Sequence, residues 1–303
     1  MPRTVHAVTG AFGYSGSHLT RTLLARGERV RNLTGHPDRP DPFRGAVEVR
    51  RLAFEDPRAL RAALEDVRVL YNTYWVRFDH GASTFARAVE HSRALFRAAA
   101  DAGVERVVHV SITNPSPDSP LPYFRGKAEV EAALRATGLS HAILRPAVFF
   151  GGRDVLVNNI AWLLRRLPAF GLVSGSYGVQ PIHVDDLARL AVEQGARRED
   201  VVLDAVGPEA LPFDELVRLV RRAVGSRALL VAVPRALLLF TSRLVGRVVG
   251  DVVLTPDEIA GLTANLLVSR GPPTAPTRFS DWLAGSAAGL GVEWASELGR
   301  HYR

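Results

Sequence analysis

The sequence predicts an α/β protein with a doubly wound parallel sheet. Short apolar runs alternate with helix-length segments through the first two thirds of the 303 residues, which is the pattern of strands joined by helical crossovers. Parallel strands require such crossovers, because each connection has to return to the same edge of the sheet. A Gly-rich turn directly after the first run, with a helical segment behind it, favours the same architecture.

Six of these runs are bounded by Gly, Pro or charged residues and are expected to be buried strands. In chain order they are Val5–Thr9, Arg29–Thr34, Val47–Leu52, Val67–Thr73, Val104–Ser111 and Ser140–Pro146. The clearest helix precedes the fifth run and covers Ser83–Ala102, where apolar side chains recur on one face. After Pro146 the pattern is irregular, and we expect helices over 154–167, 185–194 and 210–224 and late strands over 179–183 and 201–206.

Composition excludes several classes of protein. The chain has no Cys, so disulfides, Cys-ligated zinc and a thiol nucleophile are excluded, and we expect no metal site. No apolar run approaches the roughly 18 residues of a membrane span, and the first strand begins too early for a signal peptide, so we expect a cytoplasmic protein. The net charge of +7 comes from scattered Arg residues, so nucleic-acid binding is not expected.

The turn after the first strand carries three Gly residues in the spacing Gly10-x-x-Gly13-x-x-Gly16. Gly10 permits a tight turn, Gly13 lets the backbone approach a diphosphate, and Gly16 allows close packing of helix on strand. The N–H groups and the dipole at the start of the following helix favour phosphate. We therefore predict a Rossmann dinucleotide-binding domain whose contacts in this turn come from Gly10, Phe12, Gly13, Tyr14, Ser15 and Gly16.

With Thr9 in front, this turn resembles the Thr-Gly-x-x-Gly-x-x-Gly signature of extended and atypical short-chain dehydrogenases/reductases. The resemblance implies NADP or NAD as cofactor. It also implies a Rossmann domain over residues 1–150, to which residues 179–205 return. The remainder of 151–303 would form mainly a smaller, mostly helical substrate lobe.

The end of the second strand bears on the choice between NADP and NAD. An acid there would bind the adenosine ribose of NAD, whereas a nearby Arg accommodates the additional phosphate of NADP. Thr34 ends the strand without an acid, and His36 and Arg39 follow it, so NADP is favoured. Asp38 is the alternative ribose ligand. Thr73, at the end of the fourth strand, is expected beside the cofactor.

The only Lys of the chain, Lys127, follows Tyr123 by four residues. Two Pro residues ahead of Tyr123 favour a helix start, so the two side chains should lie one turn apart on one face. A phenol titrates near about 10, and an adjacent ammonium favours the phenolate, which suits the proton donor of a carbonyl reduction. Ser111, at the end of the fifth strand, would hydrogen-bond the substrate oxygen, with Thr113 as the alternative.

Ser111, Tyr123 and Lys127 resemble the catalytic triad of short-chain dehydrogenases/reductases, in which Lys127 would also hold the nicotinamide ribose. Residues 144–151 are similar to the segment that lines the nicotinamide, which implies contacts from Pro146 and Val148. Residues 182–188 resemble the late His-Val-x-Asp motif of extended members. The whole run is most similar to the branch related to an accessory NAD(P)H-binding subunit of respiratory complex I.

Aromatic residues cluster at the end of the fourth strand, namely Tyr71, Tyr74, Trp75 and Phe78. We interpret them mainly as core, with some forming an apolar wall over the substrate. Asn158 and Asn159 are either polar contacts to the substrate or amides on a helix surface. Pro234–Val249 is expected to be a packed amphipathic helix, with a helix on a membrane surface as the alternative.

These features together predict an NAD(P)-dependent oxidoreductase. The substrate would be a small molecule with a ketone, alcohol or sugar-like group, apolar or aromatic molecules included, and a homodimer is compatible with the sequence. The alternative is a dinucleotide-binding sensor or structural subunit without turnover. A complete set of Ser111, Tyr123 and Lys127 favours catalysis.

Overall fold

The computed structural model describes residues 5–301. The chain forms two compact units, which are described separately. The first contains the chain up to Pro146 together with Val184–Ala205, and the second contains Ala147–His183 and the chain from Val206 onwards.

The first unit is built on one seven-stranded sheet in the order β11-β6-β5-β4-β1-β2-β3, in which every pairing is parallel. Its strands are β1 (Val5–Thr9), β2 (Arg29–Thr34), β3 (Val47–Arg51), β4 (Val67–Asn72), β5 (Arg106–Val110), β6 (Ser140–Pro146) and β11 (Val201–Ala205). From β1 the chain winds outward in one direction through β2 and β3, and in the other through β4, β5, β6 and β11. This order confirms the doubly wound Rossmann architecture, with the switch of direction between β1 and β4.

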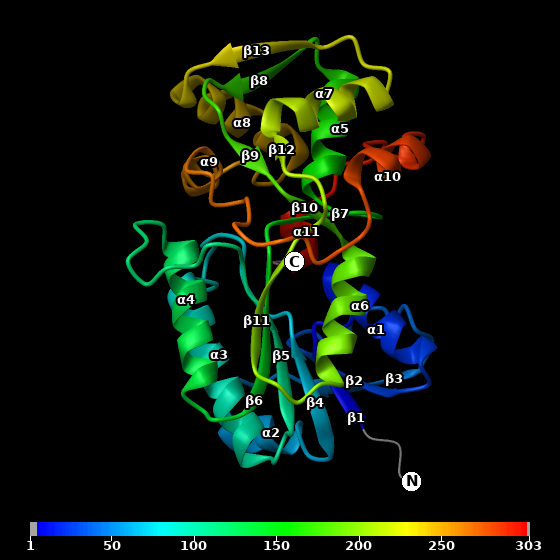
Figure 1. Cartoon of the computed structure of the whole chain (residues 1–303), viewed down its shortest axis with the longest axis vertical. Helices are drawn as coiled ribbons and strands as arrows, with labels where there is room; N and C mark the ends of the chain where they lie inside the picture. The colour runs from blue at the N-terminus through cyan, green and yellow to red at the C-terminus, as the bar shows by residue number, and fades with distance from the viewer. Residues whose placement is uncertain (1–4, 302–303) are drawn as a thin grey trace. The chain divides into compact units, whose positions relative to one another are not determined.

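Helices cover both faces of this sheet (Figure 1). They are α1 (Tyr14–Ala25), α2 (Pro57–Ala62), α3 (Phe85–Asp101), α4 (Pro122–Arg135) and α6 (Val184–Gly195). The first face carries α2, α3 and α4, and the second carries α1 and α6, which pack together. The core between sheet and α3 includes Leu70, Val107, Leu95 and Phe96, all essentially inaccessible to solvent. Because the strands are parallel, all their carboxyl ends lie at one edge, where ligands bind in such folds.

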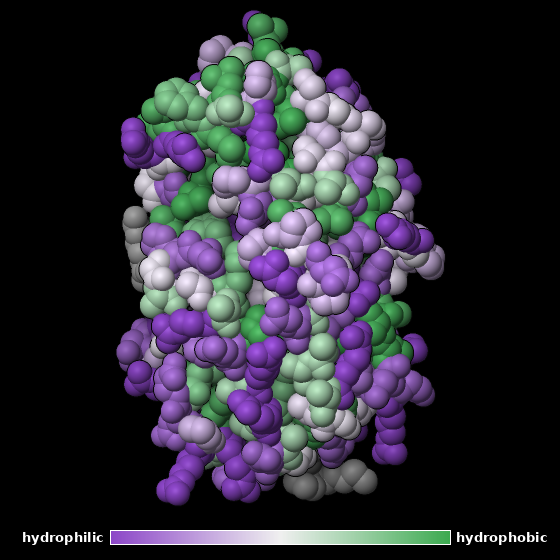
Figure 2. Space-filling view, turned by 90° about the vertical axis from the view of Figure 1, so that its left-hand side faces the viewer, coloured by the Kyte–Doolittle hydropathy of each residue, from purple (hydrophilic) through white to green (hydrophobic). Residues whose placement is uncertain are grey.

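In the second unit, helices contain more residues than strands do. These helices are α5 (Leu156–Arg166), α7 (Phe213–Ala223), α8 (Arg235–Val249), α9 (Pro256–Thr263), α10 (Phe279–Ser286) and α11 (Glu297–His301). Three short strand pairs join them: β7 (Val148–Phe150) with β10 (Pro181–His183), β8 (Ala169–Val173) with β13 (Leu229–Val233), and β9 (Gly178–Val179) with β12 (Leu211–Pro212). Hydrophobic residues gather at the upper end of Figure 2, the level at which Figure 1 draws β8, β13 and α8. Within residues 5–301, no helix combines the length and the apolar character that a membrane span requires.

Two Asn residues of α5 differ from both of our expectations. Asn158 and Asn159 are buried and hydrogen-bonded within the second unit, so they are neither surface amides nor open polar contacts. The Asn158 amide donates to the carbonyl oxygens of Gly152 and Asp154. The Asn159 side chain donates to the Ala295 carbonyl (3.1 Å) and accepts from its N–H (2.8 Å), and so attaches the C-terminal segment to α5.

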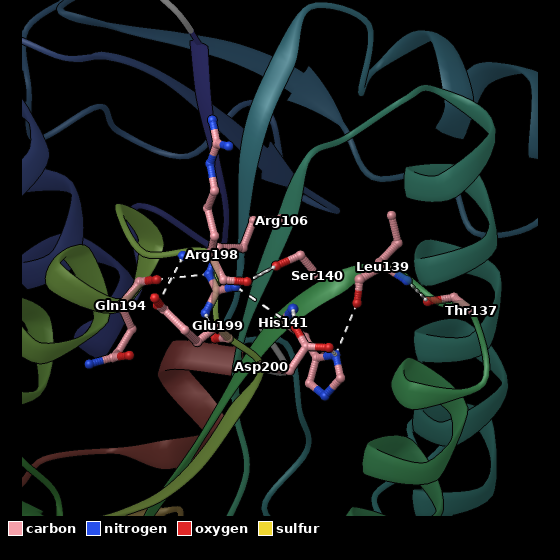
Figure 3. A network of polar contacts seen from close by, with 9 residues as sticks. All are labelled: Arg106, Thr137, Leu139, Ser140, His141, Gln194, Arg198, Glu199 and Asp200. Carbon is pink, nitrogen blue, oxygen red and sulfur yellow. Dashed lines mark hydrogen bonds and ion pairs between the residues drawn. The ribbon is translucent and has the colours of Figure 1, made fainter.

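A polar network at the amino edge of the sheet holds the returning segment of the first unit (Figure 3). The buried Arg106 guanidinium donates to the carbonyl oxygens of Gln194 and Glu199 (both 2.8 Å) and to the hydroxyl of Ser140. Ser140 donates onward to the Arg198 carbonyl at 3.0 Å. One cation thus satisfies backbone groups at the end of α6 and before β11, and fixes β11 beside β6.

We predict that Arg106→Met lowers the free energy of unfolding by about 2–4 kcal/mol, because buried acceptors lose a charged donor. Arg68→Met is the matched control at the same edge. Arg68 pairs with Glu105 at 3.3 Å with both side chains largely exposed, so its loss should cost less than about 1 kcal/mol. Equal costs for the two variants, measured by chemical denaturation, would contradict this role of Arg106.

Candidate active site

The predicted glycine turn joins β1 to α1 in the conformation that a diphosphate site requires. Gly10 has a φ of +67°, and its N–H donates to the Leu33 carbonyl at 2.9 Å. The Gly13 N–H donates to the Gly10 carbonyl at 2.8 Å. A Cβ at position 16 would lie 2.1 Å from the Gly10 oxygen, so a larger residue than Gly16 would force the turn open. The close contact between Gly16 and the Gly10 carbonyl therefore keeps the turn narrow.

The first turn of α1 is suited to an anionic group. Gly13 precedes the helix in extended conformation, and within residues 5–301 no side chain caps this end. The first turn also carries no acidic residue. Its N–H groups and the positive end of the helix dipole therefore favour phosphate, and Tyr14, Ser15 and Gly16 provide this turn, as predicted from the sequence. The observed backbone fits a dinucleotide diphosphate.

A chain of buried hydrogen bonds joins the carboxyl ends of β1, β4 and β5. The Thr9 hydroxyl donates to Asn72 Oδ1 (3.1 Å) and accepts from the N–H groups of Thr73 and Tyr74 (2.8 and 3.0 Å). The Thr73 hydroxyl donates to the Thr9 carbonyl at 2.6 Å. Asn72 Nδ2 lies 3.1 Å from His109 Nδ1. Thr73 is thus fixed at the switch point, where we predicted a cofactor contact.

The loop after β2 places two basic residues together. Thr34 Oγ1 accepts from the His36 N–H at 3.0 Å, and the Arg39 N–H donates to the His36 carbonyl at 3.3 Å. Partial burial and the positive charge of Arg39 lower the pKa of His36. Asp38, the alternative ribose ligand, is exposed in the same loop. The ring of Phe12 lies 6.2 Å from that of Phe43, between ring centres, so this loop reaches the glycine turn.

The aromatic residues after β4 divide between core and site. Tyr71 and Phe78 are buried, and burial raises the pKa of the Tyr71 phenol. The Tyr74 hydroxyl lies 2.9 Å from Nδ1 of His91, a residue of α3 that the sequence did not single out. Trp75 contacts both residues of the Tyr–Lys pair and so shapes the environment of that pair directly.

Tyr123 and Lys127 lie one turn apart on α4, and both contact the Trp75 ring. The Tyr123 ring meets it edge-on with centres 5.9 Å apart, and the Lys127 ammonium lies 4.6 Å from its centre. Between them on the helix, a Cβ at Gly126 would come 3.0 Å from Trp75 Cη2. The absence of a side chain there lets the indole pack closely against α4. A further aromatic contact to Tyr123 comes from Phe85, at 5.7 Å between centres.

The Lys127 amine is buried, with 3% of the residue exposed. It donates to the Val110 carbonyl at the end of β5 (2.9 Å) and lies over the face of Trp75, which attracts a cation. Burial lowers the pKa of Lys127 to about 7, although the nearby Glu131 carboxylate acts in the opposite direction. Burial and the charge of Lys127 hold the pKa of His109 well below its usual value. At neutral pH, the amine is therefore close to half protonated.

Ser111 has a different partner from the one we expected. Its buried hydroxyl donates to Glu131 Oε1 at 2.6 Å, so its hydrogen is not directed at a substrate oxygen. Glu131 is itself buried and accepts two hydrogen bonds from Arg145, at 2.8 and 2.5 Å, and one from Arg135 at 3.2 Å. In this arrangement Ser111 can only accept a hydrogen bond from a bound molecule. Thr113, the alternative, is fully buried, and its N–H donates to the Pro146 carbonyl.

The two remaining predicted cofactor residues belong to different units. Pro146 ends β6 at the carboxyl edge of the sheet and is buried. Val148 lies in β7 of the second unit and is half-buried. The first unit alone therefore brings together the glycine turn, Thr34, His36, Arg39, Thr73, Ser111, Tyr123, Lys127 and Pro146.

We predict that Lys127 makes stability depend on pH. In the unfolded chain its pKa is about 10.5, so between about pH 7 and pH 10 the unfolded chain binds a proton that the folded chain releases. The free energy of unfolding should therefore rise by up to about 1.4 kcal/mol per pH unit over this range. The comparison is with Lys127→Met, in which this contribution is absent and the other titrating groups remain. A difference between the two proteins that stays constant from pH 7 to 10 would contradict the prediction.

Comparison with known proteins agrees with this geometry. A family model described as NAD(P)H-binding matches residues 10–159. Sterol demethylase protein B of Methylococcus capsulatus is 34% identical over 221 residues, which cover 63% of this chain and 67% of that protein. The mitochondrial NADH dehydrogenase [ubiquinone] 1 alpha subcomplex subunit 9 of Dictyostelium discoideum is 24% identical over 227 residues, 71% of this chain and 63% of that protein. This chain thus spans less than two thirds of the latter relative.

A solved structure shows the same fold over almost the whole chain. Citrobacter sp. triphenylmethane reductase, complexed with NADP(H), superimposes with a TM-score of 0.74 at 20% identity, covering 93% of this chain and 99% of that one. The family model begins at Gly10 and extends past Tyr123, Lys127 and Pro146. The chain belongs to the NAD(P)H-binding short-chain dehydrogenases/reductases, in their extended or atypical branch.

Proposed function

We propose that this protein transfers hydride between NAD(P)H and a ketone or alcohol, with Tyr123 as the acid and base. The observation that carries the proposal is the packing of Tyr123 and Lys127 against Trp75. This pair follows the end of β5, next to β4 and the switch point at which ligands bind in such sheets. The site therefore combines a titratable phenol with a cation in a largely apolar environment.

The residues that would hold the cofactor follow from the backbone of the glycine turn. Gly10, Phe12, Gly13, Tyr14, Ser15 and Gly16 would surround the diphosphate, and Thr73 and Pro146 would lie along the nicotinamide. Lys127 would contact the nicotinamide ribose through its ammonium hydrogens. When bound, NAD(P)H supplies the hydride. Side chains of this protein would position the substrate and transfer the proton.

Tyr123 would donate its phenolic proton to the substrate oxygen as the carbonyl becomes an alkoxide. The phenolate that remains is stabilised by a positive charge one helical turn away. Because the pKa of Lys127 is about 7, the amine would bind a proton readily when a phenolate forms beside it. In the reverse direction the phenolate accepts the proton of an alcohol. The Trp75 ring would keep both groups in place and exclude water.

Ser111 would act as an acceptor in this proposal. Its hydrogen is donated to Glu131 at 2.6 Å, so its oxygen can receive the hydroxyl hydrogen of an alcohol substrate but cannot donate to a ketone in the same arrangement. The proton of a ketone reduction then comes from Tyr123 alone. Glu131 and Arg145 would hold Ser111 in position.

The loop after β2 supports NADP as the preferred cofactor. The Arg39 guanidinium lies beside the His36 imidazole there, and a cation with a neighbouring N–H donor suits the dianionic 2′-phosphate of NADP. The Asp41 carboxylate is engaged within this loop, because it accepts hydrogen bonds from the N–H groups of Phe43 and Gly45, both at 2.7 Å. The aromatic rings of Trp75 and Phe85 around Tyr123 favour a substrate with an apolar or aromatic body.

A second candidate function is a non-catalytic NAD(P)H-binding subunit. It is favoured by the engagement of the Ser111 hydroxyl with Glu131. The similarity to a subunit of mitochondrial NADH dehydrogenase points in the same direction. In this case NADPH would bind in the same glycine turn and no substrate would be reduced.

We predict that Tyr123→Phe lowers turnover by about 100-fold or more, the usual contribution of a general acid. The affinity for NADPH should stay within about twofold, since no diphosphate contact is removed. Turnover is measured as NADPH oxidation with a panel of aromatic and aliphatic ketones. Tyr177→Phe is the control, because it also removes a phenolic hydroxyl, one that donates to the Val173 carbonyl in the second unit. Unchanged turnover in Tyr123→Phe would exclude the acid role. Tight NADPH binding without turnover by the unaltered protein would favour the second candidate.

We predict that Arg39→Ala weakens NADPH binding about tenfold, equivalent to about 1.4 kcal/mol, and leaves NADH binding within about twofold. The control is Arg29→Ala, which removes an exposed Arg from the amino end of β2, the strand that precedes the loop of Arg39. Both affinities are measured by titration of the reduced cofactor. Equal weakening for NADPH and NADH would show that Arg39 does not contact the 2′-phosphate.

A further inference from the structure

Helix α8 exposes a row of large apolar side chains, although Leu238, Leu239, Val245 and Val249 are half-buried. Phe240, Leu244 and Val248 are 57%, 44% and 83% exposed, whereas the buried residues of the helix are Ser242 and Gly246. A helix of a globular protein normally turns its apolar stripe toward the core. The amphipathic helix expected over 234–249 is present, but one apolar row of it faces solvent instead of the core.

The exposed residues form one continuous stripe. Leu237, Phe240, Leu244 and Val248 are spaced by three, four and four residues, so they lie in one row along the helix. The inward side is fixed by close contacts: a Cβ at Gly246 would lie 2.6 Å from the Asp251 carbonyl. The stripe therefore cannot be buried by a simple rotation of the helix, because small residues are required on the opposite side.

Strand β13 adds to this apolar surface. Leu229 and Val231 are 67% and 41% exposed and lie on the same face of the strand as Val233. Val233 and Leu238 of α8 both approach Gly171 of β8, at 3.0 and 3.3 Å from the position of a Cβ. The face of β13 that carries Leu229 and Val231 is thus the one on which α8 packs. We call the stripe together with Leu229 and Val231 the α8 surface.

The charged residues of α8 itself are all Arg. Arg243 and Arg247 each follow a stripe residue by three positions, which places them along its flank. From residue 216 to residue 250 the sequence has no Asp or Glu. Exposed Arg residues can extend their aliphatic stems over apolar groups and keep the guanidinium in a polar layer. An apolar stripe with a cationic flank matches the interface of an anionic bilayer.

We propose that the α8 surface docks the protein on a membrane that contains anionic lipid. The stripe would enter the boundary between headgroups and acyl chains, and Arg243 and Arg247 would contact lipid phosphates. A second copy of the chain fits less well, because pairing two such stripes brings the Arg rows together without acidic partners. At the level of β8, β13 and α8, Figure 2 shows hydrophobic groups next to strongly hydrophilic ones, as such docking requires.

The test is sedimentation of the full chain with lipid vesicles. The unaltered protein should sediment with vesicles of equal parts phosphatidylcholine and phosphatidylglycerol, and bind phosphatidylcholine alone about tenfold more weakly. Phe240→Ser combined with Leu244→Ser should reduce binding about tenfold or more. Val292→Ser, at another apolar residue that is 55% exposed, should leave it unchanged.

A second pair of variants isolates the charge. Arg243→Glu with Arg247→Glu should reduce binding to the anionic vesicles at least about tenfold, while Arg222→Glu with Arg270→Glu changes the net charge equally at other exposed positions and should have little effect. An unchanged far-ultraviolet circular dichroism spectrum and an unchanged unfolding midpoint show that each variant is folded. No binding by the unaltered protein, equal binding to both vesicle types, or equal loss in the two charge variants would overturn the proposal. So would a dimer in light scattering that Phe240→Ser with Leu244→Ser converts to monomer.

Discussion

The burial of a single amine imposes the most demanding requirement on the carboxyl edge of the sheet. A charged Lys side chain is costly to remove from water unless the protein supplies compensating partners. Lys127 receives three of them: the Val110 carbonyl, the face of Trp75 and the charge of Glu131. The contact with Trp75 in turn requires Gly126, because a side chain at this position of α4 would press on the indole ring. The pair of residues that we assign to proton transfer is therefore coupled to the packing of α4 on the sheet.

Polar groups serve opposite purposes at the two edges of this sheet. At the amino edge, Arg106 is surrounded by backbone carbonyls that complete its hydrogen bonds, so its charge is fully used for structure. Buried polar atoms without a hydrogen-bond partner nevertheless lie near both edges, among them Gln194 Oε1 and His6 Nδ1 near the amino edge. At the carboxyl edge, the nitrogen atoms His109 Nε2 and Trp75 Nε1 are buried without a hydrogen-bond partner. Uncompensated groups of this kind are more common at functional sites than in structural networks.

The sequence predicted the architecture because its signals are local. Apolar runs and helical spacing can be recognised within a few residues of each other, and the close contact that requires Gly16 joins two residues within seven positions. The partner of Ser111 could not be predicted in this way. Glu131 looks like half of an ordinary surface pair with Arg135, and only the fold adds Arg145 and the serine hydroxyl. Asn158 and Asn159 likewise have partners more than 130 residues away. One feature of the sequence could have indicated the contact of Trp75 with α4, namely Gly126 between Tyr123 and Lys127.

The uniqueness of Lys127 also has a chemical consequence. Lys127 is the only Lys among the Lys and Arg residues of the sequence, so it carries the one side-chain amine. Reagents that acylate or reductively alkylate lysine therefore address one position among all side chains. Because this amine is substantially unprotonated at neutral pH and enclosed by protein, its rate of modification reports how often the surrounding packing opens. Modification of Lys127 can therefore measure the opening of the packing around the site without an introduced label.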